Sequence, residues 1–276
     1  MTGVPMPRSE ALLLVAAVAV AAAGCSKLTF VKPSAERKGG ERVAPDYSFK
    51  ETRESRSRQE ARRHASAAGQ HLRAGDVEAA AEAARLALAA DAGLPEPHTA
   101  MASVAMRQGQ TALAGRHYAE AARLAPSGST YNNLGAWLCF DGRAAESLRW
   151  FDEALGDPRF GDRAGALANA GACAAKAGEW NRVERDLRAA LDLEPENAVA
   201  LAAMARYKFG QGEYFEARAF SERRLAAGPA DAATLELASR IEEKLGDSVA
   251  AARYVQRLRT EFPQAGNALP GESSRP

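Results

Sequence analysis

The sequence predicts an all-α chain built from repeated helix–turn–helix units. Ala accounts for 64 of the 276 residues, and Ala is the best helix former among the amino acids. The sequence lacks the alternating runs rich in Val, Ile, Thr and aromatic residues that β-strands favour. In addition, a short turn containing glycine recurs about every 34 residues. Together these observations indicate stacked helical pairs.

Six turns mark the repeat, and in each a glycine precedes the expected start of a helix. The glycines are Gly75, Gly109, Gly142, Gly178, Gly212 and Gly246, at spacings of 34, 33, 36, 34 and 34 residues. Six units of 34 residues fill residues 61–264. A fixed period of this length is the signature of a repeat architecture, and it leaves no room for a separate catalytic domain.

Each unit also has two positions where small side chains allow the paired helices to approach closely. The first position is occupied by Ala68, Ala102, Gly135, Gly171, Ala205 and Ser239. The second is occupied by Ala80, Ala114, Ser147, Ala217 and Ala251, with Val183 as the exception in the fourth unit. Prolines, which end helices, follow several units at Pro126, Pro195, Pro229 and Pro263.

This pattern resembles the tetratricopeptide repeat. The resemblance implies a right-handed superhelix of six repeats, or twelve helices, in which the first helix of each repeat lines the concave face. Such a surface usually binds an extended or helical peptide. Each repeat would bury its apolar face only against its neighbours.

The first residues predict a secreted lipoprotein. The apolar run at residues 11–23 is too short to span a membrane but fits the core of a signal peptide. It ends in Ala22-Ala23-Gly24-Cys25, which resembles the bacterial lipobox. We therefore expect residues 1–24 to be a lipoprotein signal peptide, Cys25 to carry the lipid, and Ser26 to direct the protein to the outer membrane. An ordinary cleaved signal is the alternative.

Two segments flank the expected repeats. Residues 25–60 have few aliphatic side chains, so we expect a lipidated N-terminus followed by a flexible linker. Residues 265–276 are expected to form a disordered tail. The linker carries a mild excess of basic residues and is either a contact for lipid or partner, or packs loosely on the first repeat.

The sequence contains little that indicates catalysis. It has no zinc-binding His or Cys spacing, no phosphate-binding glycine loop and no nucleophile elbow, so we expect no enzyme activity, no cofactor and no small-molecule substrate. A net charge of +1 argues against a nucleic-acid partner. Cys139 and Cys173 differ by two in repeat position, so we expect two buried thiols, with a disulfide as the less favoured alternative.

Apolar and amide side chains on the expected inner face form a candidate partner-binding groove. These residues are Leu72, Met106, Asn132, Asn133, Phe140, Asn169 and Phe209. Apolar side chains there would hold a partner helix or strand, and the Asn side chains would bond its backbone. The alternative is that Phe140 and Phe209 fill the core between repeats.

A more specific resemblance lies in the third repeat. The run YNNLGAWLCFDGRAAESLRWFDEALGDPRF at residues 131–160 is similar to the PilF/PilW family. The segments LANAGACAAKAGEW, GEYFEARAFSERRL and AARYVQRLRTEFP extend the similarity. Family members combine a lipobox, a short linker and six tetratricopeptide repeats.

The resemblance implies a pilotin, which is a lipoprotein that escorts the type IV pilus secretin to the outer membrane and promotes its multimerisation. The expected partners are therefore the secretin and, through acylated Cys25, outer-membrane lipid. The alternative is a general periplasmic scaffold that recruits peptidoglycan enzymes or serves outer-membrane protein assembly.

Overall fold

The computed structural model describes residues 52–266, and in this range it contains helices and no strands. The described range holds twelve helices of 13 to 22 residues, followed by a single short turn of helix. In order they are α2 (Arg53–Ala74), α3 (Val77–Ala90), α4 (Pro95–Arg107), α5 (Thr111–Leu124), α6 (Gly128–Phe140), α7 (Ala144–Gly156), α8 (Arg163–Ala177), α9 (Trp180–Leu193), α10 (Ala198–Gly210), α11 (Tyr214–Ala226), α12 (Ala232–Leu245), α13 (Ser248–Glu261) and α14 (Pro263–Gly266).

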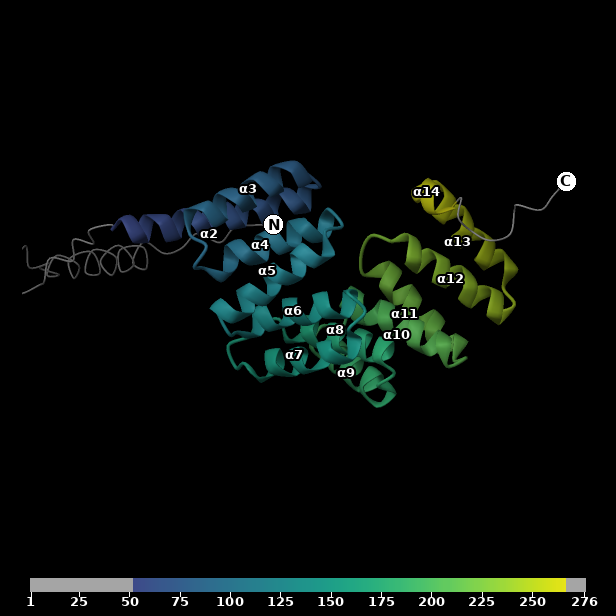
Figure 1. Cartoon of the computed structure of the whole chain (residues 1–276). Helices are drawn as coiled ribbons and strands as arrows, with labels where there is room; N and C mark the ends of the chain where they lie inside the picture. Colours follow the sequence, from purple (N-terminus) through teal and green to yellow (C-terminus); the bar gives the residue numbers. More distant parts are fainter. Residues whose placement is uncertain (1–51, 267–276) are drawn as a thin grey trace, which may run out of the picture. The chain divides into compact units, whose positions relative to one another are not determined.

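Consecutive helices pack as pairs, from α2 with α3 to α12 with α13 (Figure 1). The first helix of a pair also contacts the first helix of the next, as in α2 with α4 and α8 with α10. This confirms the all-α class and the tetratricopeptide-like pairing. The right-handed superhelix of six repeats stays a prediction.

The turns within the pairs follow the glycine pattern. All six glycines have positive φ, between 73° and 84°. At Gly246 the backbone N–H donates to the carbonyl oxygens of Glu242 and Glu243, so the glycine closes the end of α12. A side chain at this left-handed φ would be strained, which explains why glycine marks each turn.

Small residues set the distance between paired helices. A Cβ atom on Gly135 in α6 would lie 3.0 Å from Cε1 of Phe151 in α7, and Phe151 is fully buried. A Cβ atom on Gly171 in α8 would lie 2.7 Å from Cγ of Leu187 in α9. Val183, the exception in the small-residue pattern, is buried in the same cluster as Leu187.

The first helix begins earlier than the repeat pattern predicts. We expected the linker to extend through residue 60, but α2 begins at Arg53. Thr52 caps it by accepting a hydrogen bond from the backbone N–H of Ser55, and the Ser57 hydroxyl donates to the carbonyl oxygen of Ala90, at the end of α3. These bonds fix two extra turns of helix that lie before the repeat proper. At the other end, α14 extends to Gly266, so the first two residues of the expected tail are helical.

The two cysteines are bonded, contrary to our expectation of free thiols. The Sγ atoms of Cys139 in α6 and Cys173 in α8 are 2.04 Å apart, and the Cα atoms are 5.8 Å apart. The residues are separated by 34 positions and lie on the neighbouring first helices α6 and α8. Repeat position alone did not predict this distance, because the distance depends on how α6 and α8 pack against each other.

No helix in the described range is long and apolar enough to cross a membrane. Residues 1–51, which include the expected signal peptide and Cys25, lie outside the described residues.

Candidate protein-binding groove

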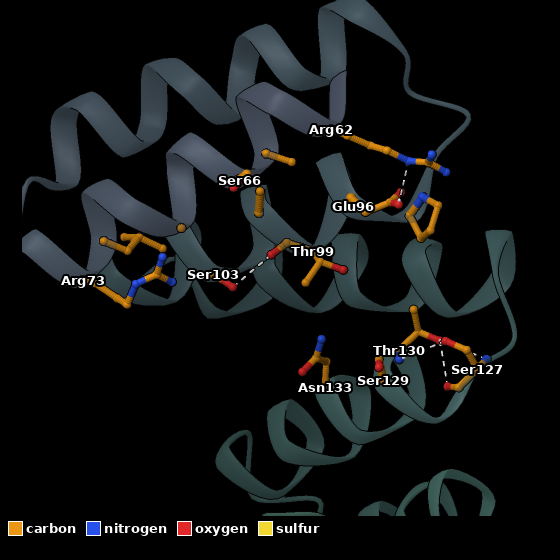
Figure 2. A pocket seen from close by; sticks show the side chains of 15 residues that line it. Arg62, Ser66, Arg73, Glu96, Thr99, Ser103, Ser127, Ser129, Thr130 and Asn133 are labelled. Carbon is orange, nitrogen blue, oxygen red and sulfur yellow. Dashed lines mark hydrogen bonds and ion pairs between the residues drawn. The ribbon is translucent and has the colours of Figure 1, made fainter. Parts of the chain in front are cut away.

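A groove of about 670 Å³ lies between α2, α4 and α6, the first helices of the first three pairs. We call it the N-terminal groove (Figure 2). Its lining residues are Arg62, Ala65, Ser66, Gly69, Leu72, Arg73, Pro95, Glu96, Thr99, Ala100, Ser103, Ser127, Ser129, Thr130 and Asn133. Since the lining comes from first helices, the groove lies on the face that the repeat pattern assigns to partner binding.

Local sequence signals position the helices that form the groove. Pro95 is the first residue of α4, where its missing N–H costs no helical hydrogen bond. Ser127 and Thr130 form a capping box at the start of α6. The Thr130 hydroxyl also lies 2.6 Å from the carbonyl oxygen of Ala125, which ties α6 to the preceding turn.

The floor of the groove offers hydroxyl and amide groups. Figure 2 shows Thr99 and Ser103 on α4 facing Ser129 and Asn133 on α6. The Ser103 hydroxyl donates to the carbonyl oxygen of Thr99 at 2.9 Å and lies 3.3 Å from the Tyr118 hydroxyl, so its oxygen can accept one further hydrogen bond. Such groups can bond the backbone of an extended segment.

Charged groups stand at both ends of the groove. Arg62 donates to Oε1 of Glu96 at 3.1 Å, while Oε2 of Glu96 is buried without a hydrogen-bond partner among the described residues. Arg73, at the end of α2, makes no hydrogen bond or ion pair within the described range. Among residues 52–266, the groove therefore offers the unpaired cation of Arg73 and an unsatisfied carboxylate oxygen of Glu96, both suited to polar groups of a ligand.

The structure separates the residues that we predicted to form one groove. Leu72 and Asn133 line the N-terminal groove. Asn132 and Asn169 bond each other, with Nδ2 of Asn169 donating to Oδ1 of Asn132 at 3.3 Å. Met106 is half-buried on α4 and lines none of the described pockets.

The two phenylalanines of that set have different environments. Phe140 is 63% exposed, so it does not fill the core between repeats. Phe209 packs against buried residues of α10, α11 and α12, and the Arg240 guanidinium lies 5.0 Å from its ring centre. The core alternative therefore holds for Phe209 and fails for Phe140.

The repeat positions used to choose candidate groove residues did not identify the polar residues of α2 that line the groove. Arg62, Ser66, Gly69 and Arg73 occur at spacings of four, three and four residues, which place them on one face of α2. That spacing is visible in the sequence, but nothing in it distinguishes a polar groove from an ordinary solvated helix face.

A histidine pair joins α4 to α5. Nδ1 of His98 in α4 is 3.0 Å from Nδ1 of His117 in α5, and Nε2 of His98 is 3.0 Å from the carbonyl oxygen of Ala92. Because a carbonyl only accepts, Nε2 of His98 donates to it, and in the neutral ring Nδ1 of His98 then accepts from Nδ1–H of His117. Burial and the neighbouring His98 and Arg116 lower the pKa of His117, while Glu120 acts in the opposite direction. No cluster of three or more metal-ligating side chains occurs in the range that the structure describes.

The chain matches no protein-family model and no curated protein sequence at a significant level. It is similar to the crystal structure of PilW, a widely conserved type IV pilus biogenesis factor, with 27% identity and a TM-score of 0.66. The match covers 75% of this chain and 95% of PilW. The chain is a PilF/PilW-like tetratricopeptide repeat protein.

Two further structures share the fold. Pseudomonas aeruginosa PilF has 24% identity and a TM-score of 0.61, with 75% of this chain and 94% of PilF covered. A tetratricopeptide repeat protein from Parabacteroides merdae has 16% identity and a TM-score of 0.60, with 72% and 77% covered. These two similarities show a shared fold.

Proposed function

We propose that the PilF/PilW-like chain is a pilotin, an outer-membrane lipoprotein that binds the type IV pilus secretin and promotes its localisation and multimerisation. The similarity to PilW carries this proposal, because it extends over 95% of a protein described as a type IV pilus biogenesis factor. The chain acts by binding, without catalysis or a cofactor.

The N-terminal groove is the proposed secretin site. Its hydroxyl and amide groups would bond the backbone of an extended secretin segment, as edge groups do in other peptide grooves. Arg73 would pair with a carboxylate on that segment, since no described residue neutralises it. Leu72 and Ala100 supply apolar contact beside these polar groups.

The proposed role of the lipid on Cys25 is to bring the bound secretin to the membrane. One acyl chain gives only reversible membrane binding, whereas several give a stable anchor. Confining subunits to one surface raises their effective concentration and favours ring closure without any new contact.

Binding to the purified periplasmic portion of the host's secretin tests the proposed site. Arg73→Glu is expected to weaken binding about tenfold, or about 1.4 kcal/mol, because it places a carboxylate where the groove offers a cation. Arg107→Glu is the matched control, since Arg107 is exposed at the end of α4 and does not line the groove.

Three outcomes distinguish the alternatives. Weakening by Arg73→Glu alone supports the groove. Equal binding by both variants moves the site elsewhere on the chain. No binding by the wild-type protein contradicts the pilotin proposal and favours a general periplasmic scaffold.

A further inference from the structure

A second hollow, of about 560 Å³, lies between α8 and α10 in the C-terminal half of the repeats. We call it the C-terminal trough. It is lined by Gly171, Ala172, Ala175, Lys176, Trp180, Ala203, Arg206, Tyr207, Gly210 and Gln211. Five of these are Gly or Ala, so a ligand can approach the backbone of both helices closely. None of the seven residues predicted to form the partner-binding groove lines this hollow.

Two aromatic side chains line the trough. Trp180, the first residue of α9, is 55% exposed, and Tyr207 on α10 is half-buried. A large exposed indole beside small residues is a common feature of protein-binding surfaces, because its burial releases much apolar area from water.

Trp180 belongs to a series of exposed apolar side chains. Phe140, Trp180, Phe215 and Val249 are all more than half exposed, and each lies within three residues of a turn glycine in one of the last four repeats. Leu193, at the end of α9, is the other large apolar side chain of the described range that is more than half exposed. In these repeats the exposed large apolar side chains are therefore concentrated at the turns within the helical pairs. Trp180 is the member of this series that lines the trough.

Among the described residues, the charged side chains that line the trough are both cations, Lys176 and Arg206. Both are exposed, and neither makes a hydrogen bond or ion pair with a described residue. Asp231 lies within electrostatic range of Arg206, but its carboxylate is bonded to Arg224 at 3.0 Å.

Lys208, the residue after Tyr207, is paired with carboxylates, unlike the two cations of the trough. Nζ of Lys208 lies within 4 Å of three carboxylates, at 3.4 Å from Glu184, 2.6 Å from Glu213 and 3.1 Å from Glu216. These contacts raise the pKa of Lys208, with Glu213 as the largest contributor. Lys208 is thus neutralised within the fold, whereas the two cations of the trough are left for a ligand.

We propose that the C-terminal trough binds a segment of a partner protein that carries an apolar side chain flanked by carboxylates. The apolar side chain lies on the small residues beside Trp180, and the carboxylates pair with Lys176 and Arg206. Charge complementarity selects an acidic segment over a neutral or basic one. This site is separate from the N-terminal groove and does not depend on the identity of the partner proposed above.

Selection from a library of random twelve-residue peptides displayed on phage tests this proposal with the full-length protein in detergent. The wild-type protein is expected to enrich peptides that combine an aromatic or aliphatic residue with Asp or Glu. The selected peptide, made synthetically, is expected to protect Trp180 from quenching by acrylamide. The Trp180→Phe variant shows which part of the fluorescence comes from Trp180, because the chain has two other tryptophans.

Charge reversal provides the decisive comparison. Lys176→Glu with Arg206→Glu is expected to weaken binding of the selected peptide at least about tenfold. Arg107→Glu with Lys244→Glu makes the same change in net charge at exposed positions outside the trough, and is expected to leave binding unchanged. Circular dichroism of both double variants verifies that the helices remain.

Several results would overturn the proposal. Enrichment without acidic residues, or equal weakening by the two double variants, would exclude specific recognition of carboxylates by the trough. Binding of a single-stranded oligonucleotide that requires Trp180 and displaces the peptide would assign the trough to nucleic acid instead. Because the selection uses no secretin, these results are independent of the pilotin proposal.

Discussion

At the scale of single residues, small side chains allow the helices to approach one another closely. Gly135 allows Phe151 to lie fully buried between α6 and α7, and Gly115 leaves space for the indole of Trp137. Trp137 then donates its Nε1 hydrogen to the carbonyl oxygen of Thr111 at 3.0 Å. The space left by a glycine on one helix is thus filled by an aromatic ring from the next helix.

Gly135→Leu is expected to destabilise the third helical pair. A Cβ atom there would already lie 3.0 Å from Phe151, so a larger side chain forces the two helices apart at a cost of about 1–3 kcal/mol or more. The melting temperature measures the effect. Gly156→Leu is the control, because Gly156 is exposed at the end of α7 and a Cβ atom on it would have no described neighbour within 4 Å. Equal melting temperatures for the Gly135 variant and the wild type would refute this packing.

The histidine pair predicts a dependence of stability on pH. Burial lowers the pKa of His117 below its usual value of 6.5, so the unfolded chain takes up a proton more readily than the folded chain. The contribution of His117 to the free energy of unfolding is therefore complete above about pH 6.5, and it is lost as the pH falls through the pKa of His117 in the folded protein.

Thermal unfolding of wild type and His117→Asn at about pH 7.5 and about pH 5 tests this effect. Asn retains an N–H near the position of Nδ1 but does not titrate, so the variant is expected to lose less stability on acidification. An identical loss in both proteins would show that other groups control the response.

At the scale of secondary-structure elements, the glycine turns and small residues predicted the helical pairs well, since both are dictated by local sterics. Register between neighbouring pairs was less predictable. The third unit has 36 residues, and ideal repeat positions placed Cys139 and Cys173 two residues out of register. The packing of α6 against α8 nevertheless brings their Cα atoms to 5.8 Å.

The disulfide is expected to stabilise the junction between α6 and α8. Cys139→Ser with Cys173→Ser should lower the free energy of unfolding by about 2–4 kcal/mol, because the unfolded chain loses a cross-link. Melting temperatures with and without reductant measure this. Reductant should lower the melting temperature of the wild type and leave that of the double variant unchanged; a wild-type protein insensitive to reductant would contradict a bonded pair.

At the scale of the whole molecule, the class of fold was predictable, whereas the location of the binding surfaces was only partly so. Leu72 and Asn133 line a groove, whereas Asn132 and Asn169 bond each other and Phe209 packs against buried residues of α10, α11 and α12. The positions of inner-face residues follow from the repeat, but whether such a residue is free or engaged depends on its neighbour in the next repeat. The C-terminal trough arises from two helices one repeat apart in sequence and had no local signal.

The proposed pilotin combines a lipid anchor, a repeat scaffold and a secretin partner. Deleting the gene in its host and measuring the heat-resistant secretin multimer in outer-membrane fractions tests this combination most directly. We expect loss of the multimer, recovery with the wild-type gene, and no full recovery with Cys25→Ala, which leaves the protein without its anchor. An unchanged multimer in the deletion strain would contradict the pilotin function.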